Sequence, residues 1–248
     1  MASPLDGSGI RSLLLDIEGT TSPIAFVHDV LFPYARARVA AFLDRNARAS
    51  GVKADVERLR QEHGVESGSN AELPAWRDDT AAATLSSVVS YVGWLMDRDR
   101  KSTGLKSLQG RIWEEGYRTG TLTGEVYPDV PRALGRWQGQ GRDIAIFSSG
   151  SVLAQRLLFG HTAAGDLTPF LRSYFDTTTG PKAAAESYQR IAGSLQRAPA
   201  EMLFASDTVA ELEAARDAGL ATVLCVRGAE PPDTKGHAVV HGFDVVFP

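Results

Sequence analysis

The chain has 248 residues, of which 43% are hydrophobic and 23% are charged, a composition typical of globular proteins. This length accommodates one large domain, or one domain that carries a smaller inserted one. The formal net charge of -4 argues against a broadly basic surface, so neither a nucleic acid nor an anionic membrane is expected as a partner.

The N-terminal segment and the single cysteine bear on where the protein works. The segment "MASPLDGSGIR" lacks the basic and long apolar regions of a signal peptide, and no run approaches the ~18 apolar residues of a membrane span. The lone cysteine, Cys225, excludes an intrachain disulfide and lies in an apolar run, which predicts a buried thiol. We therefore expect a cytoplasmic protein.

The first predicted element is a strand at residues 10–16, "IRSLLLD", whose unbroken apolar run is typical of a strand buried on both faces. Two acids, Asp16 and Glu18, stand two residues apart at its end. Residues 29–120 then contain long helical patterns and almost no strand signal. We interpret them as a helical domain inserted after the first strand, with bounds at residues 25–120.

Strands and helices alternate in the rest of the chain. Apolar runs predict strands at residues 143–149, 173–177, 201–206 and 221–227, and a short final strand over "FDVVF". Helical patterns lie between them at residues 150–160, 181–196 and 207–220, the second opening on Pro181 and the third stopping at Gly219. This order predicts an α/β fold, a doubly wound parallel sheet formed by residues 1–24 and 121–248.

Polar residues follow the predicted strands, where the ligands of open α/β sheets bind. They are, in chain order, Asp16 with Glu18, Ser148 with Ser149 and Gly150, Lys182, and Ser206 with Asp207. Each alone has an ordinary structural interpretation as a turn residue, a helix N-cap or a solvated lysine. Their joint occurrence after consecutive strands indicates a site for a phosphate group and a metal ion.

Each residue type has a role in phosphoryl transfer. Asp16 can attack phosphorus and form an aspartyl-phosphate, and Asp16 with Asp207 supplies the oxygen ligands that Mg²⁺ prefers. The serines after the second strand, with main-chain N–H groups at a helix start, can hold the phosphoryl oxygens. Lys182 can offset the negative charge. Glu18 can protonate the leaving oxygen and then deprotonate the attacking water.

These stretches resemble the motifs of the haloacid dehalogenase superfamily, in the order "LLLDIEGTT", "IFSSG", Lys182 and "LFASD". The resemblance implies that the inserted helices form a cap domain. The superfamily commonly has a second aspartate where this chain has Glu18. Two alternatives keep the fold: a dehalogenase, which needs neither Mg²⁺ nor this second acid, and a phosphatase of the phosphoglycolate type. A third is a phosphate-binding protein without catalysis.

Longer stretches resemble the enolase-phosphatase family of methionine salvage, namely "DIEGTTSPIAFVHDVLFPYAR", "SSGSVLAQRLLFGH", "GPKAAAESYQRIA" and "LFASDTVAELEAARDAGL". This resemblance implies a Mg²⁺-dependent enzyme that enolises 2,3-diketo-5-methylthiopentyl-1-phosphate and then dephosphorylates it to the dihydroxy acireductone. It implies Asp16, Glu18 through its carbonyl, and Asp207 as metal ligands, Asp16 as nucleophile and Glu18 as acid/base. The implied substrate-binding residues are Ser148, Ser149, Gly150 and Lys182.

Enolisation also requires a base that removes a proton from the carbon bearing the phosphate. Glu18 is the first candidate because it lies near the reacting end of the substrate. His28, in "FVHDVLF", is the second candidate, and a purely structural histidine at this position stays open. All these residues belong to one chain, so we expect a monomer that acts on a small phosphorylated diketone.

Overall fold

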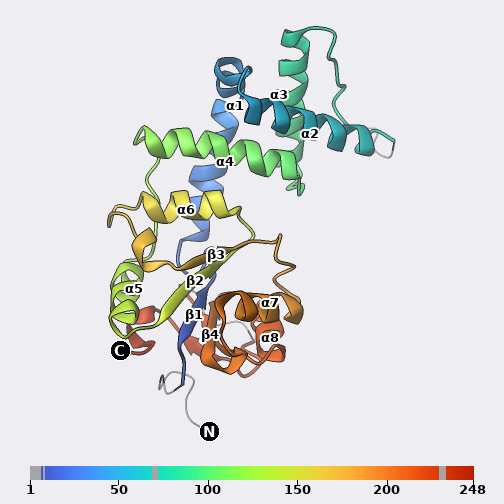
Figure 1. Ribbon diagram of the computed structural model, residues 1–248. Helices are drawn as coiled ribbons and strands as arrows, with labels where there is room; N and C mark the ends of the chain where they lie inside the picture. Colours follow the sequence, from blue (N-terminus) through green and yellow to red (C-terminus); the bar gives the residue numbers. More distant parts are fainter. Residues whose placement is uncertain (1–6, 8, 69–71, 229–232) are drawn as a thin grey trace. The chain divides into compact units, whose positions relative to one another are not determined.

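Six parallel strands form one sheet in the computed structural model, which describes residues 7, 9–68, 72–228 and 233–248 (Figure 1). The strands are β1 (Ser12–Leu15), β2 (Asp143–Phe147), β3 (Ser173–Phe175), β4 (Met202–Ser206), β5 (Ala221–Cys225) and β6 (Ala238–Val240). They lie in the order β3-β2-β1-β4-β5-β6. This is the strand order of doubly wound α/β folds, so the predicted fold class is confirmed.

Helices connect the strands and make up the long insertion. The α-helices are α1 (Phe32–Asn46), α2 (Ser50–Glu66), α3 (Ala81–Asp97), α4 (Thr103–Arg118), α5 (Asp129–Gly139), α6 (Val152–Gly160), α7 (Ala185–Leu195) and α8 (Val209–Asp217). A π-helix, η1 (Phe26–Leu31), precedes α1, and 3₁₀ turns are found at η2 (Thr168–Phe170), η3 (Pro199–Glu201) and η4 (Phe243–Val245). Among the helices that the structure describes, none is both long and apolar enough to span a membrane.

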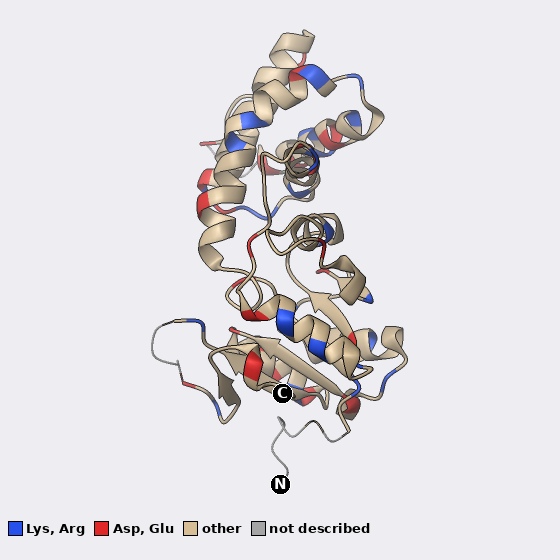
Figure 2. Cartoon of the chain, turned by 90° about the vertical axis from the view of Figure 1, so that its left-hand side faces the viewer, with Lys and Arg blue, Asp and Glu red and all other residues tan. Residues whose placement is uncertain are grey.

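The chain divides into two compact units. One combines Met1–Val27 with Thr123–Pro248 and contains the sheet, and the other, His28–Leu122, contains α1 to α4. In the helical unit α4 packs against α1 and α2, and α3 packs against the same two helices. Acidic and basic residues are interspersed over the helices of both units (Figure 2).

The core of the sheet unit explains why residues 13–15 are three consecutive leucines. Leu14 is fully buried in a cluster with Phe147 of β2 and Tyr188 of α7, beneath α7 and α8. Its neighbours Leu13 and Leu15 alternate to the opposite face and are equally buried. Figure 1 shows α5 on that side of the sheet and α7 with α8 on the other. A strand covered on both faces carries apolar residues at every position.

One predicted helix begins later than expected. The helix predicted from Pro181 is α7, and it starts at Ala185. The hydroxyl of Tyr188 donates to the carbonyl of Lys182, and the hydroxyl of Ser187 donates to the carbonyl of Pro181, both at 2.7 Å. These bonds hold residues 181–184 in a turn, so Lys182 lies before the helix and not in it.

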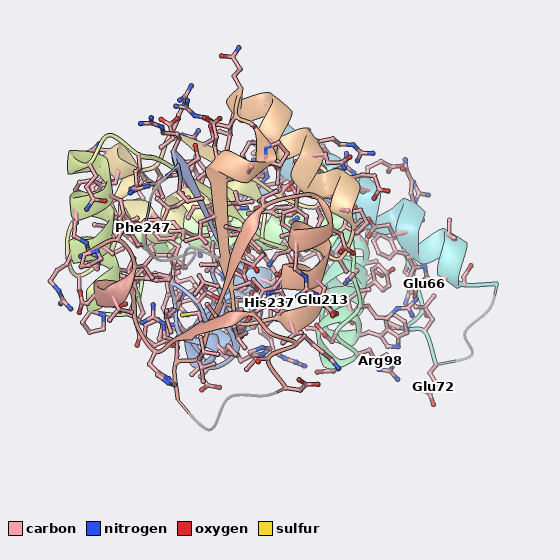
Figure 3. All side chains as sticks on the ribbon, turned by 90° about the horizontal axis from the view of Figure 1, so that it is seen from below. Glu66, Glu72, Arg98, Glu213, His237 and Phe247 are labelled. Carbon is pink, nitrogen blue, oxygen red and sulfur yellow. The ribbon has the colours of Figure 1, made fainter. Side chains whose placement is uncertain are left out.

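The final strand predicted over "FDVVF" is wrong. The last strand is β6, which lies ahead of this run where no strand was predicted, and residues 229–232 are outside the described residues. Phe243 begins a 3₁₀ turn, where its ring packs edge-on to Trp137 at 5.3 Å and its N–H donates to Asp129. The apolar run therefore covers α5, and Phe247 at its end lies against the same helix (Figure 3).

Candidate active site

The carboxyl ends of β1, β2 and β4 meet at one edge of the sheet because these parallel strands are neighbours. Asp16 follows β1, Ser148 follows β2 and Asp207 follows β4. The sheet therefore brings together three of the predicted site residues, as the sequence order suggested. Lys182 joins them from the turn between β3 and α7.

Asp16 is held on both of its carboxylate oxygens. Its side chain is buried, with Oδ1 accepting a hydrogen bond from Nζ of Lys182 at 2.6 Å. The hydroxyl of Ser206 lies 3.3 Å from Oδ2. The main chain is fixed as well, since the N–H of Asp16 donates to Ala205 and its carbonyl accepts from the hydroxyl of Thr21. The carboxylate thus points from a rigid strand end, as a nucleophile requires.

Lys182 bridges two carboxylates. Its Nζ lies 2.6 Å from Asp16 and 2.7 Å from Glu211 of α8, and its side chain is only 8% exposed. Burial disfavours the ammonium, but the charges and hydrogen bonds of the two carboxylates outweigh it and raise the pKa of Lys182. The group therefore stays cationic throughout the neutral range.

The carboxylates outnumber the cation. Burial raises the pKa of Asp207, and the charge of Asp16 raises it further. The same two causes, in the same order, raise the pKa of Glu211 against the opposing effect of Lys182. Three carboxylates thus share one ammonium group, which leaves two negative charges at the sheet edge. A divalent cation would offset them.

Gly19 makes room for the carboxylate of Asp207. A Cβ atom at Gly19 would lie 2.1 Å from Oδ2 of Asp207, and its φ of +69° is one that other residues rarely adopt. The ordinary structural interpretation of Asp207 would be an N-cap, and it is wrong, because Thr208 is the N-cap residue of α8. The carboxylate of Asp207 instead lies against the loop after β1, where it can reach a cation together with Asp16.

The donor set fits a hard cation. Within the described residues, no cluster of three or more His, Cys, Asp or Glu side chains is arranged to hold a metal ion. The residues predicted here are two carboxylates, Asp16 and Asp207, with the main-chain carbonyl of Glu18. Mg²⁺ typically takes one or two protein carboxylates and completes its shell with water and substrate oxygens, so this smaller set suits it.

The loop after β2 precedes a helix, as predicted. Ser148 is buried, and its hydroxyl accepts from the N–H of Gly150 at 3.1 Å, whereas Ser149 is exposed. Ser151 caps α6, so main-chain N–H groups at this helix start lie beside the loop. The buried amide of Gln155 donates to the carbonyls of Gly150 and Phe175, which ties the loop to the end of β3.

The two candidates for the enolising base lie in different units. Glu18 is half-buried in the loop that follows β1. His28 is the first residue of the helical unit, is exposed, and packs its ring edge-on to Phe32 at 5.6 Å. Glu18 is therefore the candidate that belongs to the same unit as Asp16.

Sequence reasoning assigned no role to Ser206 and overlooked Glu211. The Ser206 hydroxyl lies 3.0 Å from the carboxylate of Glu211 and 3.3 Å from that of Asp16, so it lies within hydrogen-bond distance of both acids. Glu211 stands four residues after Asp207, so Asp207 lies just before the N-cap of α8 and Glu211 lies in the first turn of that helix. This spacing is the sequence pattern from which Glu211 could have been predicted as a site residue.

Comparison with known proteins identifies the family of this chain. A family model described as haloacid dehalogenase-like hydrolase matches residues 10–219. A relative named enolase-phosphatase E1 from Synechococcus elongatus is 54% identical over 95% of this chain and 97% of its own length. One of the same name from Azotobacter vinelandii is 45% identical over 96% of this chain and 98% of its own length.

A solved structure extends the comparison to the fold. The crystal structure of the UTR4 protein from Saccharomyces cerevisiae has a TM-score of 0.75 and 32% identity, and the match covers 95% of this chain and 99% of that one. The match extends over both units of the chain. Together, these similarities show that the chain belongs to the haloacid dehalogenase-like hydrolases and, within them, to the enolase-phosphatase E1 family.

Proposed function

We propose that the chain enolises 2,3-diketo-5-methylthiopentyl-1-phosphate and then removes its phosphate to give the dihydroxy acireductone, as a step of methionine salvage. One observation carries the phosphatase half. A buried aspartate, Asp16, is hydrogen-bonded to a buried lysine, Lys182, at the carboxyl edge of a doubly wound sheet. The 54% identity to an enolase-phosphatase E1 supports the enolase half and the choice of substrate.

The proposed phosphate transfer uses three side chains. Asp16 attacks phosphorus and forms an aspartyl-phosphate, and Lys182 offsets the charge that the two anions bring together. Glu18 protonates the departing alkoxide oxygen and then takes a proton from the water that hydrolyses the intermediate. The loop residues Ser148, Ser149 and Gly150 hold the non-bridging phosphoryl oxygens, which stay on the phosphorus as it moves to Asp16.

We further propose that Mg²⁺ is the cofactor, held by Asp16, Asp207 and the carbonyl of Glu18. When bound, it neutralises the excess negative charge of the site and polarises the oxygens of the substrate. Glu18 is our first candidate for the base that starts enolisation, and His28 is the second. The helical unit His28–Leu122 is proposed as the cap domain, and the monomeric state stays a prediction.

The metal requirement provides the test of this function. After EDTA treatment the chain should release no phosphate from the diketo phosphoester, and Mg²⁺ should restore release in the unchanged protein but not in Asp207→Asn. In EDTA, Asp207→Asn should melt higher than the unchanged protein, on the order of 2 °C, because it removes a carboxylate whose charge is disfavoured by burial and by repulsion from Asp16. Phosphoglycolate serves as the comparison substrate.

Two outcomes would contradict the proposal. Full activity in the chelator would point to chemistry of the dehalogenase type, in which no metal is needed. Equal kcat/KM for the diketo phosphoester and phosphoglycolate would point to a phosphatase of broad specificity.

A further inference from the structure

In the loop that follows β1, three main-chain N–H groups donate to the same carbonyl. The main-chain N–H groups of Thr20, Thr21 and Ser22 all donate to the carbonyl of Ile17, at 2.9 to 3.1 Å. This compact turn leaves the carbonyl of Thr20 without a partner inside the loop, although Thr20 itself is fully buried. A buried carbonyl needs a donor from elsewhere.

Arg227, just after β5, supplies that donor twice. Its Nε and Nη2 lie 3.0 and 2.7 Å from the carbonyl oxygen of Thr20. Its Nη1 lies 2.8 Å from each carboxylate oxygen of Asp129, the first residue of α5. The two side chains are only 8% and 11% exposed. One guanidinium therefore joins the loop after β1 to the ends of two other elements.

The guanidinium is also held on its faces. Its carbon lies 4.3 Å from the ring centroid of Tyr127 and 4.7 Å from that of Phe243. The carboxylate of Asp129 is fixed in turn, since it accepts a hydrogen bond from the N–H of Phe243. A planar group held by aromatic rings and a paired carboxylate has one orientation, so it transmits that orientation to the carbonyl of Thr20.

We propose that Arg227 is a positioning residue for the acid/base Glu18. The contacted carbonyl belongs to Thr20, two residues after Glu18 and one after Gly19, which lies against Asp207. Fixing this carbonyl fixes the turn from which the side chain of Glu18 leaves. The inference rests on the proposed function, in which Glu18 protonates the leaving oxygen. Lysine keeps the charge at position 227 but cannot make the forked contact to two partners.

Leaving-group chemistry tests this role separately from stability. Phenyl phosphate and 4-nitrophenyl phosphate are similar in size, but phenolate is the more basic leaving group and gains more from protonation. The ratio of their kcat/KM values reports this step, because kcat/KM excludes the later hydrolysis of the aspartyl-phosphate. Arg227→Lys should lower kcat/KM for phenyl phosphate by roughly tenfold, since a misplacement of about 1 Å can cost 10²-fold, and lower it much less for the nitrophenyl ester.

Three further variants make the result decisive. Glu18→Gln should widen the same ratio more than Arg227→Lys does. Arg132→Lys, which affects an exposed ion pair between α5 and Asp244, should leave it unchanged. If Arg227→Lys does not fold, Asp129→Asn, which keeps the shape and one acceptor oxygen, should widen the ratio in the same direction.

The outcomes separate the two proposals. An equal loss on both esters in Arg227→Lys, with a widened ratio in Glu18→Gln, would overturn the role of Arg227 and leave that of Glu18 intact. An unchanged ratio in Glu18→Gln would overturn the acid role itself, and the inference about Arg227 with it.

Discussion

Replacing Asp16 with asparagine should lower phosphate release by about 10⁴-fold or more, the order of loss expected when a covalent nucleophile is removed. An amide oxygen is a poor nucleophile and a weaker ligand for Mg²⁺, so both proposed roles of this side chain are lost together. The fold should persist. Lys182 keeps Glu211 as a partner at 2.7 Å, and its charge is not left alone in the interior.

Phosphate release and thermal unfolding of the Asp16→Asn variant should be measured side by side. Asp244→Asn is the matched control, since Asp244 is an exposed acid paired with Arg132, and it should keep full activity. Near-normal turnover by Asp16→Asn would show that another group attacks phosphorus.

Replacing Lys182 with methionine should lower phosphate release nearly as much as Asp16→Asn does. It should lower the free energy of unfolding more than Asp16→Asn does. Asp16 and Glu211 would then face each other with no cation between them. Leaving a buried charge without its partner costs about 3–5 kcal/mol of unfolding free energy. A second change, Glu211→Gln, removes one of the two carboxylate charges that Lys182 contacts, so the double variant should recover stability. Its activity should stay low because the ammonium that offsets the phosphate charge is still missing.

The stability of the Lys182→Met variant should depend on pH because of Glu211. The pKa of Glu211 is already raised in the folded protein, so its ionised form destabilises the fold above that pKa, and this cost is relieved as the pH falls. Chemical denaturation across the acidic range should therefore show the variant regaining stability at lower pH. Lys235→Met, at an exposed pair with Asp233, is the control.

The activity of the double variant Lys182→Met/Glu211→Gln tests the role of Lys182 in phosphate transfer. A double variant as active as the unchanged protein would refute that role.

The sequence predicted the sheet well because local and global signals agree there. β1 is buried at every position and carries three consecutive leucines, and β2, β3 and β4 are each followed by an α-helix. The prediction failed where a few tertiary contacts determine the local secondary structure. The start of α7 is delayed by the hydroxyl of Tyr188, and the run after Gly242 covers α5 because Asp129 and Trp137 engage Phe243.

The same limit applies to the site. Asp16, Ser148 and Asp207 could be predicted because each directly follows a strand, and strand ends of a parallel sheet share an edge. Arg227 also follows a strand, but its significance depends on Thr20 and Asp129, which lie far away in the sequence. A contact between a side chain and a main-chain carbonyl leaves no trace in the sequence of either partner.

The most direct test of the proposed function follows two signals in one reaction. The chain is incubated with the diketo phosphoester and Mg²⁺ while enol absorbance and free phosphate are recorded together. The proposed order predicts a transient enol that appears before phosphate is released, and EDTA should suppress the phosphate signal. Phosphate release without any enol, at the same rate as from unrelated phosphoesters, would contradict the assignment as an enolase-phosphatase.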